Sequence, residues 1–221
     1  MTWPSFSPLI IAHDVGRSRD RSTAVIGGNC PDRSKLIGIT ELEELPVGLY
    51  GTARASALVA VDRRQQHGSL IVADLSSDPT YGEVLHQTFG PRVIGLHISR
   101  HGDGMTAERR SVSNGSMLVY TVGRSYLLEL FHSALQAAQV KIVDGTMSRQ
   151  AYAQLAELDT EVRESGIVYS CPSGKHDDLG ISCAMLTWAA RHPHLDFWAS
   201  TALAARRPRP PRDAFGWRAF V

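Results

Sequence analysis

Two short apolar runs in this sequence each lead into an aspartate that is followed by turn residues. Residues 9–12 lead to Asp14, and residues 70–73 lead to Asp74. This pattern predicts a strand buried on both faces of a sheet, with one charged side chain delivered to the sheet's edge. A buried carboxylate is costly to desolvate unless it is paired or binds a cation. The two runs therefore predict an α/β sheet with a charged site at its rim.

A third acidic segment strengthens the prediction of a metal site. Asp177 and Asp178 open the last long apolar helix, a position that the free backbone N–H groups and the helix dipole favour for aspartate. If the strands of Asp14 and Asp74 are parallel neighbours, their carboxylates emerge about 5 Å apart. Two anions this close repel each other and invite Mg²⁺ or Mn²⁺. Each acid alone is equally well explained as a turn or capping residue, but together they predict a metal centre.

The order of the expected elements indicates a mixed sheet. We expect strands at 9–14, 23–27, 36–40, 70–75 and 93–98, and helices at 52–66, 81–89 and 124–138. The strand–helix–strand connection through residues 52–66 can place the strand of Asp74 parallel to that of Asp14. Antiparallel strands first and alternating elements later predict an α/β fold with helices flanking a mixed sheet.

Several strings resemble a known family of nucleases. HDVGRSRDRSTAVIGG, IVADLSSDPTYGEVLHQTFG and the closing GKHDDLGISCAML are similar, in this order, to the nuclease domain of phage large terminases. The resemblance runs from about residue 9 to about residue 190, and HDDL after a Gly-Lys turn is its most specific part. It implies an RNase H-like mixed sheet, with antiparallel hairpin strands and parallel strands, flanked by helices. It also implies a RuvC-like endonuclease that cuts double-stranded DNA with two divalent metal ions, Mg²⁺ or Mn²⁺.

The sequence departs from that family at two places near the expected site. Residues 75–78 read Leu-Ser-Ser-Asp where glycines usually follow the second acid, which predicts a loop of different shape. Ile181 stands where many relatives carry another acid, so Asp178 is favoured as the third ligand with Asp177 in support. No G-x-x-x-x-G-K-[ST] motif occurs, so no nucleotide and no ATPase motor are expected. The chain is either the nuclease half of a terminase or a free-standing relative.

The resemblance assigns roles to individual residues. We expect Asp14, Asp74 and Asp178 to be catalytic, and Asp177 to join them as a metal ligand. Candidates for support of the metals are His176, Asp20 and Asp78. The position of His176 before the two acids favours a site role over that of a surface-loop histidine, whereas Asp20 and Asp78 are more simply explained as turn residues. Candidates for contact with DNA phosphates are the basic residues Arg17, Arg100, Arg109, Arg110, Arg124 and Lys175. For the polar segment 99–115, which forms a hairpin in the family, a solvated loop has equal weight.

Composition limits the remaining possibilities. The 221 residues are 43% hydrophobic and 20% charged, which predicts one domain over residues 1–205. The net charge is only +1, so a DNA contact would be a local patch. Cys30, Cys171 and Cys183 lack metal-finger spacing and are expected to be reduced thiols. No signal peptide or membrane span is evident, which predicts a soluble protein of the bacterial host cytoplasm, not secreted and with no membrane partner.

The tail from residue 206 to residue 221 differs in composition from the rest. It is rich in proline and arginine, with Phe215, Trp217 and Phe220 among them. Such a segment can stack on nucleic acid or dock on a protein such as a portal, a small terminase or a separate ATPase subunit. A tail that folds back onto the domain is the alternative.

Two other functions remain open at the level of sequence. The same acids serve Holliday-junction resolvases and RNase H-type nucleases, which would prefer a four-way junction or an RNA–DNA hybrid to plain duplex. The chain could also be a catalytically inactive DNA-binding or packaging assembly module. The complete set of acids argues against inactivity, because a degenerated nuclease usually loses at least one ligand.

Overall fold

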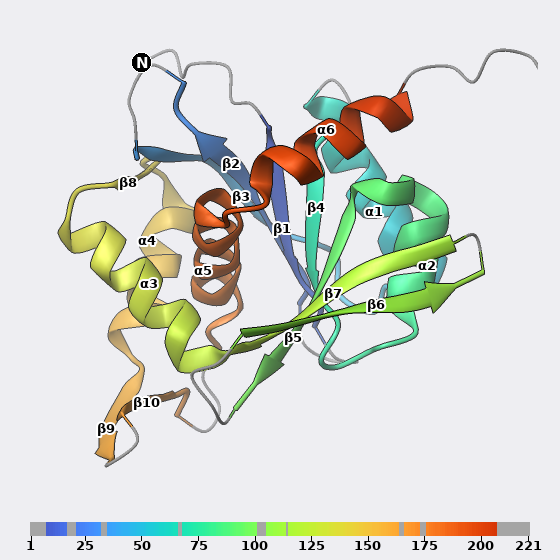
Figure 1. Cartoon of the computed structure of the whole chain (residues 1–221). Coiled ribbons are helices and arrows are strands. Elements are labelled where there is room, and N and C mark those ends of the chain that lie inside the picture. The colour runs from blue at the N-terminus through green and yellow to red at the C-terminus, as the bar shows by residue number, and fades with distance from the viewer. Residues whose placement is uncertain are drawn as a thin grey trace, which may run out of the picture.

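The fold is built on one large mixed sheet (Figure 1). The computed structural model describes residues 8–16, 21–31, 35–65, 68–100, 105–113, 115–163, 166–172 and 176–206. The strands of the large sheet are β1 (Ile10–Asp14), β2 (Thr23–Asn29), β3 (Ile37–Glu44), β4 (Leu70–Asp74), β5 (Val93–Ser99), β6 (Met105–Val112), β7 (Gly115–Gly123) and β8 (Val140–Ile142). A separate two-stranded hairpin is formed by β9 (Asp159–Arg163) and β10 (Gly166–Ser170).

Seven helical segments complete the part of the chain that is described. They are α1 (Gly51–Arg64), α2 (Tyr81–Phe89), the 3₁₀ segment η1 (Gly90–Arg92), α3 (Arg124–Gln136), α4 (Thr146–Ala156), α5 (Asp178–Arg191) and α6 (Leu195–Arg206). None of these helices is long and apolar enough to cross a membrane.

The strand order of the large sheet is β6-β7-β5-β4-β1-β2-β3-β8. Strands β1, β2 and β3 form an antiparallel meander, and β4 adds on the other side of β1 in parallel. Strands β5 and β7 continue the parallel part, and β6 pairs antiparallel with β7 at the edge. The prediction that the strands of Asp14 and Asp74 are parallel neighbours is confirmed, as is the mixed α/β architecture.

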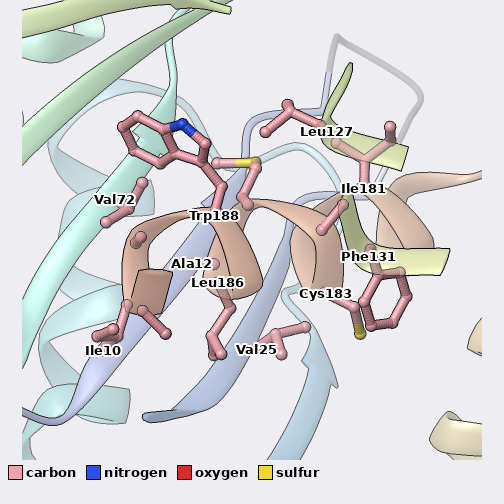
Figure 2. Packing of buried hydrophobic residues seen from close by; sticks show 14 of the residues in the cluster. Ile10, Ala12, Val25, Val72, Leu127, Phe131, Ile181, Cys183, Leu186 and Trp188 are labelled. Atoms are coloured by element: carbon pink, nitrogen blue, oxygen red, sulfur yellow. The ribbon is translucent and has the colours of Figure 1, made fainter. Parts of the chain in front are cut away.

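Alternation along the strands divides the interior into two cores. On β1, Ile10 and Ala12 pack with α3, α4, α5 and α6, whereas Ile11 packs with α1 and α2 on the other face. Helix α5 is buried on nearly all sides, because it lies between the sheet and its neighbours α3 and α4. Figure 2 shows Trp188 and Leu186 of α5 pointing into this first core. Burial on all sides explains why α5 reads as a continuous apolar run and not as an amphipathic helix.

Strand alternation predicts that His13, next to Asp14 in the sequence, points to the opposite face of the sheet and is structural. It is fully buried, its Nδ1 lies 2.8 Å from the Thr23 carbonyl oxygen, and its ring packs edge-on against Tyr81. Burial lowers the pKa of His13 to about 4. A neutral histidine that uses one ring nitrogen for a strand carbonyl is a packing residue, which agrees with the prediction.

Three further expectations can be compared with the fold. Residues 105–112 form a strand, β6, antiparallel to β7, so the hairpin implied by the resemblance is present. Strand β6 is exposed along most of its length, and the contact of its arginines with DNA stays a prediction. The three cysteines form no disulfide with one another: Cys30 and Cys183 are buried and Cys171 is half-buried. The tail 207–221 lies outside the described residues.

Candidate metal centre

Asp14 and Asp74 end two neighbouring parallel strands at one edge of the sheet. The pairing of His13 with Ala73 places the two aspartates at the next position of each strand. By alternation both belong to the face that α5 covers. Together with Asp177 and Asp178 they line a pocket of about 360 Å³. All four acids that were predicted to hold a metal therefore meet at one place in the structure.

The start of α5 is fixed to the end of β2. Thr23 pairs directly with Asp14 across the β1–β2 ladder, and its hydroxyl donates to the Asp178 carbonyl oxygen at 3.3 Å. The same hydroxyl lies 2.6 Å from Oγ of Ser182, one turn further along α5. These two contacts hold the first turn of α5, and with it Asp178, beside Asp14.

Gln154 of α4 caps the same helix. Its Oε1 accepts hydrogen bonds from the backbone N–H groups of Leu179 at 3.0 Å and Gly180 at 3.3 Å. Free N–H groups of a first helical turn need such acceptors when they are buried. Neither Thr23 nor Gln154 was identified from the sequence, because each acts through a contact with residues far away in the chain.

We expect Gln154→Ala to destabilise the protein by about 1–3 kcal/mol, because it leaves two buried N–H groups without an acceptor. Urea unfolding followed by circular dichroism measures this change in the free energy of unfolding. The matched control is Gln150→Ala on the same helix, whose side chain bonds the carboxylate of Glu44 near the surface. Equal losses in the two variants would contradict the capping role of Gln154.

The loop after Asp74 is held by the hydrogen bonds of its two serines. Both the hydroxyl and the backbone N–H of Ser76 donate to Oδ1 of Asp74, the latter at 2.9 Å. The Ser76 hydroxyl oxygen accepts the N–H of Ile98 at 2.6 Å, and the Ser77 hydroxyl donates to the Val15 carbonyl oxygen at 2.8 Å. The two serines thus join the ends of β1, β4 and β5 and fix the orientation of the Asp74 carboxylate.

The charges of Asp74 and Asp178 act on Asp14. Burial raises the pKa of Asp14 well above its usual value, and the charges of Asp74 and Asp178 raise it further. Burial also raises the pKa of Asp74, an effect that the hydrogen bonds from Ser76 oppose. A cation bound between these carboxylates would relieve the repulsion that raises the pKa of Asp14.

The other candidates are spread more widely. Arg100 and Arg124 line the pocket, and Arg124 forms an ion pair with Oδ2 of Asp177. Nδ1 of His176 lies 3.9 Å from Oδ2 of Asp178, and its side chain is 60% exposed. Arg17, Asp20 and Lys175 lie outside the described residues.

Besides His176, three further candidates among the described residues do not line the pocket. Asp78 is at the start of α2, where its Oδ1 accepts hydrogen bonds from the Thr80 hydroxyl at 2.6 Å and the Tyr81 N–H at 3.3 Å. Its carboxylate thus binds polar groups at the start of α2. Arg110 on β6 bonds Nε2 of His97 at 2.9 Å and pairs with Glu108. Arg109, next to it, points to the opposite face of the sheet by strand alternation.

The donor set fits a hard divalent cation. Among the described residues, no three His, Cys, Asp or Glu side chains lie close enough together to form a ready-made metal group. The pocket nevertheless offers carboxylate oxygens from β1, β4 and α5, which are the donors that Mg²⁺ and Mn²⁺ prefer. Asp14, Asp74 and Asp178 are the residues that would hold such ions.

We expect Asp14→Asn to stabilise the metal-free protein, by an amount that grows with pH. Because the folded-state pKa of Asp14 is raised, the folded protein binds more protons than the unfolded chain and loses stability as the pH rises towards that pKa. Asparagine has no charge to desolvate and escapes this loss. Urea unfolding in EDTA at about pH 5 and about pH 8 measures the difference between variant and wild type. A gain in the free energy of unfolding that is equal at both pH values, or a loss, would contradict a raised pKa of Asp14.

Comparisons with known proteins agree with the fold. No family model matches the sequence, and no curated protein sequence matches it either. Among solved structures, the large terminase nuclease from thermophilic phage G20c matches with a TM-score of 0.57 and 15% identity, over 86% of this chain and 87% of that one. The large terminase nuclease domain of Thermus phage P74-26 matches with a TM-score of 0.52 and 17% identity, over 82% and 78%.

A third similar structure is the large terminase nuclease domain of bacteriophage SPP1 with bound Mn. Its TM-score is 0.47 at 14% identity, over 83% of this chain and 86% of that one, a likeness too weak to add to the fold assignment. The first two matches confirm the resemblance seen in the sequence. Over most of its length this chain has the RNase H-like fold of phage large terminase nuclease domains.

Proposed function

We propose that this protein is a metal-dependent endonuclease that hydrolyses phosphodiester bonds of double-stranded DNA. The observation that carries the proposal is the meeting of Asp14, Asp74 and Asp178, from three separate elements, in one pocket of a terminase nuclease fold. Isolated acids at strand ends are common, whereas three acids that share a pocket, two of which raise the pKa of the third, Asp14, are typical of a functional site.

The three carboxylates would hold two divalent ions, Mg²⁺ or Mn²⁺. When bound, such ions generate a nucleophile from water and stabilise the departing 3′ oxygen. The protein's own part is geometric: Ser76 fixes the carboxylate of Asp74, and Thr23 fixes the start of α5 beside Asp14. His176, close to Asp178, can orient that carboxylate or a water on the solvent side of the pocket.

The pocket also suggests how DNA is bound. Arg100 and Arg124 are the basic residues at its wall, and guanidinium groups suit phosphate oxygens. Contacts to phosphates position a duplex but carry no sequence information, so we expect cutting with little sequence preference. Together with the fold, this favours a role in making or finishing genome ends during viral packaging in the host cytoplasm. Partners in that role would be a portal, a small terminase or a separate ATPase subunit.

The test is cleavage of supercoiled plasmid in Mn²⁺, Mg²⁺ or EDTA. The proposal predicts nicked and then linear plasmid with either metal, and no product in EDTA. A four-way junction and an RNA–DNA hybrid, supplied at the same concentration, measure whether duplex DNA is the preferred substrate. DNA binding without cutting in any metal, with the fold intact, would contradict the proposal and indicate a binding module.

A further inference from the structure

Asp177 differs from the other three acids of the pocket in how its carboxylate is used. It is the N-cap residue of α5, yet its side chain makes no capping hydrogen bond. An N-cap aspartate ordinarily accepts from the second or third N–H of its helix. Here those two N–H groups, of Leu179 and Gly180, donate to Gln154 of α4 instead. The carboxylate of Asp177 is therefore released from its usual local partner.

The released carboxylate has a different partner. Oδ2 of Asp177 forms an ion pair with Nη2 of Arg124, the first residue of α3. Asp177 is 9% exposed and the Arg124 side chain is 23% exposed, so solvent screens this pair much less than a surface pair. A carboxylate neutralised by a guanidinium is a poor competitor for a divalent cation, because its charge is already compensated.

Arg124 is also close to the acids that would hold metal. Its charge lowers the pKa of Asp14, in opposition to the larger effects of burial and of the Asp74 and Asp178 charges. Its Nε and Nη2 are buried and neither has a hydrogen-bond partner among the described residues, so the contact with Asp177 is an ion pair without a hydrogen bond. The side chain is nevertheless partly exposed and lines the pocket. A guanidinium carries five N–H donors in a planar fork, and the ion pair engages only part of that fork. Arg124 therefore retains donors at the wall of the pocket.

We propose that Asp177 positions Arg124 and does not hold a metal ion, and that Arg124 binds the phosphate at which the DNA is cut. This inference rests on the proposed function and assigns separate roles within its site. Asp14, Asp74 and Asp178 form the metal set, and the Asp177–Arg124 pair forms a phosphate-binding arm that joins α5 to α3. A donor held in place before the substrate arrives stabilises charge that develops on the phosphate without having to reorganise.

The first experiment measures Mn²⁺ binding by calorimetry without DNA. Asp74→Asn, which removes a metal ligand, should weaken Mn²⁺ binding about 10-fold or more. Asp177→Asn should leave Mn²⁺ affinity within about 3-fold of the wild type, because Asp177 is not one of the proposed metal ligands. A loss in Asp177→Asn as large as that in Asp74→Asn would overturn the assignment.

The second experiment measures cutting. Arg124→Ala should lower kcat about 100-fold at saturating Mn²⁺, since one phosphate donor is lost, and added guanidinium should restore part of the rate. Arg124→Lys, which keeps the charge and is the safer variant for folding, should lie between Arg124→Ala and the wild type. The double variant Arg124→Ala with Asp177→Asn should be no slower than Arg124→Ala alone, because the two residues act as one unit.

Two results of the second experiment would overturn the inference. One is Arg124→Ala cutting at the wild-type rate, and the other is a double variant whose loss equals the product of the two single losses. If the wild type itself cuts nothing, the proposed function fails, but the Mn²⁺ titration still decides whether Asp177 is a metal ligand.

Discussion

Asp74→Asn should lose metal-dependent plasmid cutting by about 1,000-fold or more while the protein still folds. The substitution keeps the size of the side chain, and its amide oxygen can still accept the two hydrogen bonds that Ser76 donates. The substitution removes one of the three negative charges of the proposed metal ligands Asp14, Asp74 and Asp178. Because burial already disfavours an ionised Asp74 and a bound cation would stabilise that charge, the loss should appear in catalysis and not in folding.

The rate of plasmid nicking in Mn²⁺ measures the loss of cutting, and the melting temperature in EDTA measures whether the variant is still folded. Asp144→Asn is the matched control, since the Asp144 side chain is 91% exposed and lies before α4, outside the pocket. It should cut like the wild type. An Asp74→Asn protein that is folded and cuts within about 10-fold of the wild-type rate would show that Asp74 holds no essential metal.

Trp188→Ala should destabilise the protein by about 3–5 kcal/mol, the usual cost of emptying a large aromatic site in a core. Trp188 is 2% exposed and lies near the end of α5, where its ring contacts Tyr120, His192 and Trp198, with ring centroids 5.3, 4.9 and 5.8 Å away respectively. These rings join α5 to β7 and α6. Their loss should therefore loosen several elements together.

Urea unfolding measures the cost of Trp188→Ala, with Phe197→Ala on α6 as an aromatic control. Phe197 is 60% exposed, and its replacement should cost less than about 1 kcal/mol. A loss below about 1 kcal/mol in Trp188→Ala would mean that the cluster is not part of a close-packed core.

The acids at the ends of β1 and β4 could be found from the sequence because their signal is local. A continuous apolar run that ends in aspartate predicts both a buried strand and the position of its charge, and parallel strands bring their ends to one edge. The same holds for Asp178, since the long apolar run of α5 begins directly after it. To place these three residues in one site, only the order of neighbouring strands had to be predicted. The strand–helix–strand connection predicts that order.

The contacts that orient those acids could not be found in this way. Thr23 and Gln154 fix the start of α5 from β2 and α4, across 155 and 25 residues of sequence respectively. The pairing of Arg124 with Asp177 likewise depends on how α3 docks beside α5. The sequence is compatible with two roles for Asp78, support of a metal ion or capping of the following helix. In the structure its carboxylate accepts the Tyr81 N–H at the start of α2. Strand β6 is exposed along most of its length and has no apolar alternation to reveal it.

The most direct test of the metal centre is anomalous diffraction from crystals soaked in Mn²⁺. The account predicts Mn²⁺ peaks in the pocket between β1, β4 and α5, at about 2 Å from carboxylate oxygens of Asp14, Asp74 and Asp178. It also predicts that the Asp177 carboxylate stays with Arg124 in that structure. Crystals that bind Mn²⁺ only elsewhere, or not at all at a concentration that supports cutting, would contradict it.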